Sequence, residues 1–158
     1  DTVSYVVNRN INYTNICYFK CQFCAFSKGK LSENLRGRPY DLSHEEIQRR
    51  TQEAWDRGAT EVCMQGGIHP DYTGQTYLDI LHTVRAASPG MHVHAFSPLE
   101  VAQGAATLGI GIEPFLQRLK AQVFLIRDQG RFRPAAAGQD IGDVFLRHLV
   151  KNGAEATL

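Results

Sequence analysis

Strand-like runs alternate with helix-like stretches over the first two thirds of the chain, and this order restricts the folds that it can adopt. Apolar residues at helical spacing predict helices over three ranges, Ser43–Arg57, Thr76–Ala87 and Pro98–Leu108. Apolar, β-rich runs predict strands over four ranges, Val3–Val7, Asn10–Thr14, Glu61–Gln65 and Met91–Phe96. Strands that alternate with helices of this length form βαβ units, so we expect an α/β fold with a parallel sheet.

Residues at the expected helix ends support these bounds. Ser43 and Glu46 match a capping box, with Ser43 as the N-cap of the first helix. Pro98 suits the first turn of the third helix. On the first helix, we expect Ile47, Ala54 and Trp55 to face the core.

Composition narrows the class of protein. A chain of 158 residues, 43% hydrophobic and 21% charged, can bury the core of one domain. The net charge of +1 does not indicate a nucleic acid or an acidic membrane surface as a partner. No apolar run approaches the roughly 18 residues of a membrane span, and the cysteine usage suits a reducing compartment. We therefore expect a cytoplasmic protein, and the start at Asp1 rather than Met indicates a piece of a longer one.

Three of the four cysteines lie in one short run. Cys17, Cys21 and Cys24 have the spacing C-x3-C-x2-C, so their thiolates can converge on one metal centre if the loop wraps around it. Three thiolates are one short of the usual four-cysteine iron–sulfur ligation, so a cube held this way keeps one iron open. They are also one short of a closed zinc site, and no fourth ligand stands at zinc-finger distance. The motif favours an iron–sulfur cluster over zinc, a disulfide or coincidence.

This motif, with Phe23 just before the last cysteine, resembles the signature of the radical S-adenosylmethionine (SAM) superfamily. The segments Asn8–Asn15, Glu61–Pro70 and His92–Val101 are similar to the FO synthase family, which makes a deazaflavin precursor. The resemblance extends from the start of the chain to about Lys120. The same subgroup holds radical SAM enzymes of the futalosine pathway to menaquinone, which stay an alternative.

The resemblance implies a six-stranded partial (β/α) barrel of the TIM type, here truncated to about its first half. It also implies a [4Fe-4S] cluster that cleaves SAM to methionine and a 5′-deoxyadenosyl radical. In the FO synthase family this radical activates L-tyrosine, and the 4-hydroxybenzyl group is transferred to 5-amino-6-(D-ribitylamino)uracil. The implied partners are these two substrates, an electron donor, and a second radical SAM domain that is either fused or separate.

In a parallel α/β sheet, chemistry gathers at the carboxyl ends of the strands. The cysteine loop, Gln65–Pro70 and Ser97–Glu100 each follow an expected strand, so we expect them to meet on one face. By resemblance, Cys17, Cys21 and Cys24 hold the cluster.

The other site residues are also assigned by resemblance. Phe23 packs near the adenine, and Gly66 and Gly67 receive the methionine amino group of SAM. Ser97 and Glu100 contact SAM or the substrate. These residues also have ordinary structural interpretations, which stay open. In these, Phe23 is a core residue, Gly66 and Gly67 form a turn, and Ser97 caps a helix.

One departure affects the amino-group site. Ile68 stands where the superfamily has an acidic residue, so backbone carbonyls or Gln65 would have to bind the amino group.

Three residues on the later strands complete the candidates. His92 and His94 alternate with period two, so both point to one side, as lumen residues or as a structural pair. Cys63 lies in an apolar strand, and we interpret it as a small buried hydrophobe.

The last part of the chain departs from the family. We divide the chain into residues 1–120, the N-terminal half of a radical SAM barrel domain, and residues 121–158, a divergent tail of unknown role. A whole TIM barrel takes about 250 residues, so at most one further unit fits after Lys120. A last helix is expected over Asp140–Lys151. We therefore expect the chain alone to be inactive, and a catalytically dead remnant or a simple iron–sulfur or zinc protein is a further alternative.

Overall fold

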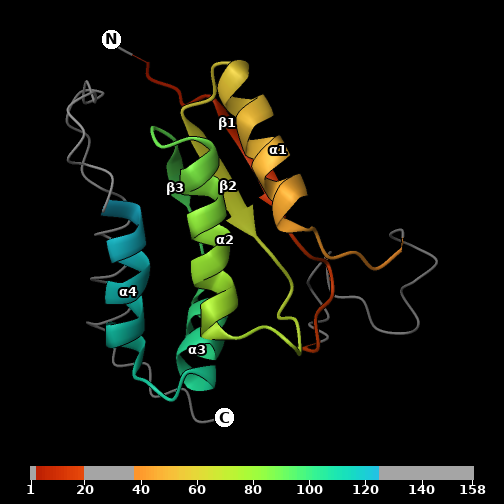
Figure 1. Ribbon diagram of the computed structural model, residues 1–158, viewed down its shortest axis with the longest axis vertical. Coiled ribbons are helices and arrows are strands. Elements are labelled where there is room, and N and C mark those ends of the chain that lie inside the picture. Colours follow the sequence, from red (N-terminus) through yellow and green to blue (C-terminus); the bar gives the residue numbers. More distant parts are fainter. Residues whose placement is uncertain (1–2, 20–37, 125–158) are drawn as a thin grey trace. The chain divides into compact units, whose positions relative to one another are not determined.

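In the part of the chain that the structure describes, three parallel strands form the centre of the fold, in the order β1-β2-β3 (Figure 1). The computed structural model describes residues 3–19 and 38–124. The strands are β1 (Asn8–Asn12), β2 (Glu61–Gln65) and β3 (His92–His94). In the register of the sheet, Asn10 is the partner of Cys63, and Cys63 is the partner of His94.

Within the described residues, four helices accompany these strands. They are α1 (His44–Asp56), α2 (Gly74–Ala87), α3 (Pro98–Thr107) and α4 (Ile112–Phe124). In Figure 1, α1 and α2 lie side by side in front of the sheet, and α4 packs against α2 and α3. The helices α1 and α2 connect successive parallel strands, so the structure contains two βαβ units. None of the described helices has the length and apolar character needed to cross a bilayer.

The helices begin where side chains satisfy their free N–H groups. The Oγ of Ser97 accepts from the N–H of Glu100 at 3.4 Å, and the Glu100 carboxylate accepts from the N–H of Ser97 at 2.6 Å. This is a complete capping box, with Pro98 in the first turn of α3 as predicted.

At α1 only half of the predicted box forms. The Oγ of Ser43 accepts from the N–H of Glu46 at 3.3 Å. The Glu46 carboxylate instead accepts from Arg49 at 2.8 Å and from Arg50 at 2.7 Å. Two guanidinium partners at i+3 and i+4 compete with the backbone N–H for this side chain.

The two faces of the sheet differ in character. Ile11, Val62, Met64 and Val93 are buried among the helices and belong to the core. The residues between them carry polar or small side chains and are exposed or half-buried; they are Asn8, Asn10, Asn12, Glu61, Cys63, Gln65, His92 and His94. The period of two along each strand separates a dry face under the helices from a polar face opposite.

The structure confirms the predicted α/β class and the parallel sheet. The strand Glu61–Gln65 and the first helix lie where they are predicted, and His92 and His94 share one face. The second helix begins two residues before Thr76 and β3 is shorter than the expected Met91–Phe96, while α3 ends at Thr107 with Leu108 as its C-cap.

Three predictions of local structure are wrong. Val3–Val7 is not a strand: its valines and Tyr5 are exposed, and β-rich composition without a neighbouring strand does not form a ladder. The first strand of the sheet begins at Asn8 rather than Asn10. Trp55 is 43% exposed, although its ring lies over Gly90.

Helix α4 is not among the predicted elements. Its sequence signal is present, because Ile112, Phe115, Leu116 and Leu119 have helical spacing, and Phe115 is fully buried. The expected helix Asp140–Lys151 lies outside the described residues.

Candidate functional site

The first cysteine of the motif lies where the carboxyl ends of β1 and β2 meet. Cys17 is a free, half-buried thiol five residues after the end of β1. The N–H of Tyr18 donates to the carbonyl oxygen of Ile68 at 3.1 Å, and the N–H of Gly67 donates to that of Thr14 at 2.9 Å. These bonds hold Cys17 against the segment that follows β2. The other residues of the motif, Cys21, Phe23 and Cys24, lie outside the described residues.

The segments before and after the cysteine motif are joined to each other by hydrogen bonds. The side chain of Asn15 donates to the carbonyl oxygen of Arg38 at 3.2 Å and accepts from the N–H of Tyr40 at 2.8 Å. The hydroxyl of Thr14 donates to the carbonyl oxygen of Tyr40 at 2.8 Å. Thr14 and Asn15 are buried, so these bonds are shielded from water. Residues 14–15 and 38–40 therefore form a closed base for the segment that contains the motif.

Gly66 and Gly67 allow neighbouring parts of the chain to approach closely. A Cβ on Gly67 would lie 2.2 Å from the carbonyl oxygen of Ile16 and 2.9 Å from the Cβ of Cys17. A Cβ on Gly66 would lie 2.3 Å from the ring of Tyr13. Only glycine fits at both positions, because backbone or a buried ring occupies the place of the side chain. The glycine pair thus allows the cysteine loop to pack closely against the end of β2.

Glu100 connects all three segments that were expected to meet. Its Oε1 accepts from the hydroxyl of Tyr13 at the end of β1 and from the N–H of Gly66 at 3.1 Å. Its Oε2 accepts from the N–H of Ser97 at the start of α3. The side chain of Glu100 is fully buried. One carboxyl group with three protein donors therefore bridges all three segments.

Burial also changes the acidity of this group. Loss of solvent raises the pKa of Glu100 to about 7, although the N–H groups of Ser97 and Gly66 act in the opposite direction. At neutral pH the carboxyl is thus close to its titration midpoint. A protonated carboxyl can donate one hydrogen bond and accept others, so both forms suit partners such as the Tyr13 hydroxyl.

Aromatic rings form a layer below these segments. Tyr13 stacks on Tyr72 with centroids 6.2 Å apart and meets the edge of Phe96 at 6.1 Å. Tyr77 of α2 contacts Phe96 with centroids 5.1 Å apart, and His69 stacks on Tyr72 at 4.7 Å. Burial raises the pKa of Tyr72, whose hydroxyl is bonded to Asp41, and that of Tyr77. We call this layer of Tyr13, Tyr72, Tyr77 and Phe96 the aromatic floor; its packed rings exclude water from this end of the sheet.

One polar atom of these rings has no hydrogen-bond partner among the described residues. That atom is the hydroxyl oxygen of Tyr77, which is buried. Tyr18 and Cys17, of the cysteine loop, also contribute to its raised pKa, after burial. A buried hydroxyl without a hydrogen-bond partner is energetically unfavourable. A polar ligand bound beside the cysteine loop could supply that partner.

The described residues fit an iron–sulfur centre with a bound cosubstrate. Cys17 offers an accessible thiol on a fastened loop, and the glycine pair lies beside it. The N–H groups of both glycines are already bonded within the protein, so a ligand amino group there would meet carbonyl oxygens or the exposed side chain of Gln65. Whether Gly66, Gly67, Ser97 and Glu100 contact a cosubstrate stays a prediction.

Sequence reasoning missed the residues that hold the site together. Tyr13, Thr14 and Asn15 are all buried at the end of β1, and each bonds to another segment. Their signal is a run of hydroxyl and amide side chains between a strand and a metal-ligand motif, where backbone groups need partners.

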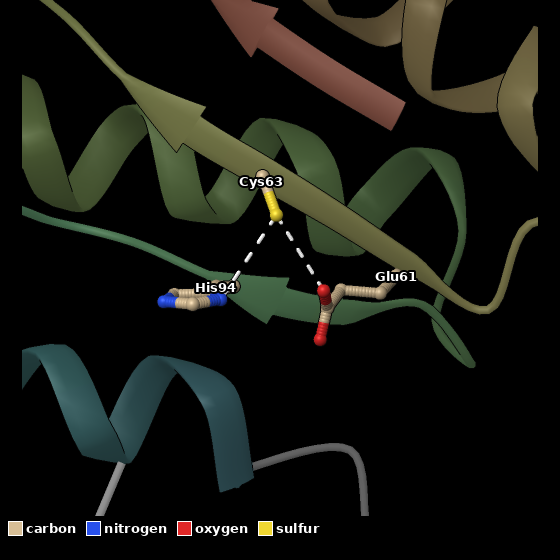
Figure 2. Close-up of side chains that lie close together, drawn as sticks. All are labelled: Glu61, Cys63 and His94. Carbon is tan, nitrogen blue, oxygen red and sulfur yellow. Dashed lines mark hydrogen bonds between the residues drawn. The ribbon is translucent and has the colours of Figure 1, made fainter. Parts of the chain in front are cut away.

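The interpretation of Cys63 as a buried hydrophobe is wrong. Its thiol lies on the polar face of the sheet, near the side chains of Glu61 and His94 (Figure 2). Alternation along β2 places Val62 and Met64 in the core and turns Cys63 the other way. His69 has a local role in the described residues, because its Nδ1 accepts from the N–H of Asp71 at 3.1 Å.

A comparison of the sequence with models of protein families identifies the family of this chain. The family model described as "Radical SAM superfamily" matches residues 11–133, which is most of the chain. The match begins in β1, contains all three cysteines of the motif and continues beyond α4.

Individual curated proteins are similar to this chain at a more specific level than the superfamily. The chain is 52% identical over 120 residues to an FO synthase of Streptomyces avermitilis, an alignment that covers 76% of this chain and 14% of that protein. It is 49% identical over 120 residues to an FO synthase of Mycobacterium tuberculosis, with the same coverage. It is 45% identical over 118 residues to a 5-amino-6-(D-ribitylamino)uracil--L-tyrosine 4-hydroxyphenyl transferase of Methanopyrus kandleri, covering 75% of this chain and 31% of that protein. The chain therefore spans only a small part of the length of these relatives.

Proposed function

Because this chain belongs to the radical SAM superfamily, we propose that Cys17, Cys21 and Cys24 hold a [4Fe-4S] cluster that keeps one iron open for SAM. The observation that carries the proposal is the fixed position of Cys17 against Gly67, at the carboxyl ends of two parallel strands. When bound and reduced, the cluster supplies the electron that cleaves SAM to methionine and a 5′-deoxyadenosyl radical.

The residues of the chain then have separate tasks. The bonds of Thr14 and Asn15 fix the base of the cysteine segment. Glu100 holds the ends of β1 and β2 to the start of α3, and Gln65 and the carbonyl oxygens of the glycine pair face the amino group of SAM. The aromatic floor keeps water away from one side. Phe23 packs near the adenine.

We further propose that the complete enzyme transfers the 4-hydroxybenzyl group of L-tyrosine to 5-amino-6-(D-ribitylamino)uracil, with an external electron donor. About half of the residues are identical to FO synthases over the aligned part, and the transferase relative is named for these two substrates. The chain spans a small share of each relative, so the activity belongs to a longer protein or assembly in which residues 1–120 supply part of the barrel.

A hybrid enzyme tests this proposal directly. The 120-residue segment of the Streptomyces avermitilis FO synthase that aligns with this chain is replaced by the matching residues of this chain. After anaerobic reconstitution, we expect the hybrid to form FO from tyrosine and the diaminouracil. The same hybrid with Cys21→Ala should form no FO, because the cluster of this segment lacks a ligand.

Two results of the hybrid experiment would contradict different parts of the proposal. A hybrid that binds its cluster and cleaves SAM but leaves tyrosine intact would contradict the assignment of the substrates while leaving the superfamily chemistry in place. A Cys21→Ala hybrid that folds and still forms FO would contradict the role of the cysteines.

A further inference from the structure

Three chemically different ligand groups meet on the polar face of the sheet, away from the cysteine loop. Glu61 and Cys63 are two residues apart on β2, so their side chains share a face, and His94 is the register partner of Cys63 on β3. The backbone of the sheet thus brings a carboxylate, a thiol and an imidazole together (Figure 2). All three candidate ligand atoms lie within 4.8 Å of one another.

The separations suit a tetrahedral metal site. The Sγ of Cys63 is 3.5 Å from Oε1 of Glu61 and 3.9 Å from Nδ1 of His94. In a tetrahedral zinc site, with Zn–S of about 2.3 Å and Zn–N or Zn–O of about 2.0 to 2.1 Å, sulfur lies about 3.6 Å from each of the other ligand atoms. Small side-chain rotations are enough to bring the three groups onto one ion.

Two neighbouring side chains are placed as outer partners of such a site. The side-chain amide of Asn8 donates toward the Sγ of Cys63 at 3.7 Å. The Nε2 of His92 lies 3.6 Å from Oε2 of Glu61, the oxygen that does not face the thiol. Groups that bond to metal ligands in this way orient them and adjust their basicity.

We propose that Glu61, Cys63 and His94 bind one zinc ion, in a site that is separate from the cysteine motif. Zinc accepts thiolate, imidazole and carboxylate ligands together, and three protein ligands leave a fourth position for water or for an oxygen or nitrogen donor of a small molecule. Cys63 lies within β2, four residues before Gly67, the residue against which Cys17 packs.

The test uses the full chain with Cys17, Cys21 and Cys24 all replaced by Ser, so that only the new site offers a thiolate in a ligand cluster. Anaerobic titration with Co²⁺ should give one ion per chain and a thiolate-to-cobalt charge-transfer band, and one equivalent of Zn²⁺ should remove the band. Added Cys63→Ser should abolish the band. His94→Gln should weaken Co²⁺ binding by more than the roughly 10- to 100-fold that loss of an outer partner costs.

His82→Gln is the matched control, because His82 is an exposed histidine on α2. It should leave the titration unchanged. Circular dichroism of each variant confirms folding, and if Cys63→Ser does not fold, the His94→Gln titration decides. Metal analysis of the wild-type chain after cluster reconstitution and addition of one equivalent of Zn²⁺ should find one bound zinc besides the iron. No Co²⁺ band in the Ser-substituted chain, or a band that survives Cys63→Ser, would overturn the proposal.

Discussion

Replacing Gly67 with Ala should displace the cysteine loop and reduce cluster binding. The added Cβ would lie 2.2 Å from the carbonyl oxygen of Ile16, whereas real Cβ contacts stay beyond about 3.0 Å, so the backbone must retreat by at least about 0.8 Å. Cys17 is the next residue, and a ligand set tolerates errors of only about 0.5 Å. Overpacking of this kind lowers the free energy of unfolding by about 1 to 3 kcal/mol.

The assay measures iron and sulfide per chain after anaerobic reconstitution, together with urea unfolding of the metal-free chain. Gly111→Ala is the control, since its Cβ would meet only Pro114, at an ordinary 3.4 Å. We expect Gly67→Ala to lose both iron and stability and Gly111→Ala to keep both. Full iron and unchanged stability in Gly67→Ala would refute the close-packing argument. Full iron with weakened SAM binding would instead assign the glycines to the cosubstrate.

Three further predictions concern Glu100 and its partners. At acidic pH, Glu100→Ala should lower the free energy of unfolding by about 3 kcal/mol in urea, because one buried and two part-buried donors lose their acceptor at about 1 to 3 kcal/mol each, and a loss under about 1 kcal/mol would contradict this. Tyr13→Phe removes one donor and leaves the other two in place, so it should cost only about 1 kcal/mol in the same assay. The raised pKa of Glu100, about 7 against 4.5, means that its stabilising effect is complete below about pH 4.5 and is lost as the pH rises through 7. Urea unfolding should therefore show the wild-type chain losing up to about 3 kcal/mol over this range relative to Glu100→Gln, and parallel pH profiles would refute the shift.

The architecture could be predicted because its signals are local. Helix α1 has an N-cap serine and a periodic apolar face, and β2 is a short apolar run that ends at two glycines. Each of these features acts through neighbours in the sequence, so a single sequence contains them. The run Val3–Val7 shows the limit, because a strand also needs a partner, and its composition does not say whether one is present.

The interior of the site could not be predicted in the same way. The resemblance predicts that Glu100 contacts SAM or the substrate, and this stays a prediction. It does not predict that Glu100 accepts from Tyr13, 87 residues earlier, and from Gly66, 34 residues earlier. Bonds over such separations depend on how the βαβ units stack, which a motif does not encode. Cys63 was assigned to the core from its apolar neighbours, and its true face depends on the phase of the strand, where a shift of one residue reverses every side chain.

The central claim is that the three cysteines of one loop hold a cluster with an open iron. Iron and sulfide analysis of the anaerobically reconstituted chain, compared with its Cys21→Ala variant, tests this claim most directly. We expect about four iron and four sulfide ions per chain in the wild type, and loss of cluster absorbance in the variant. A full cluster in Cys21→Ala, or a wild-type chain that takes up zinc at the motif in place of iron and sulfide, would contradict it.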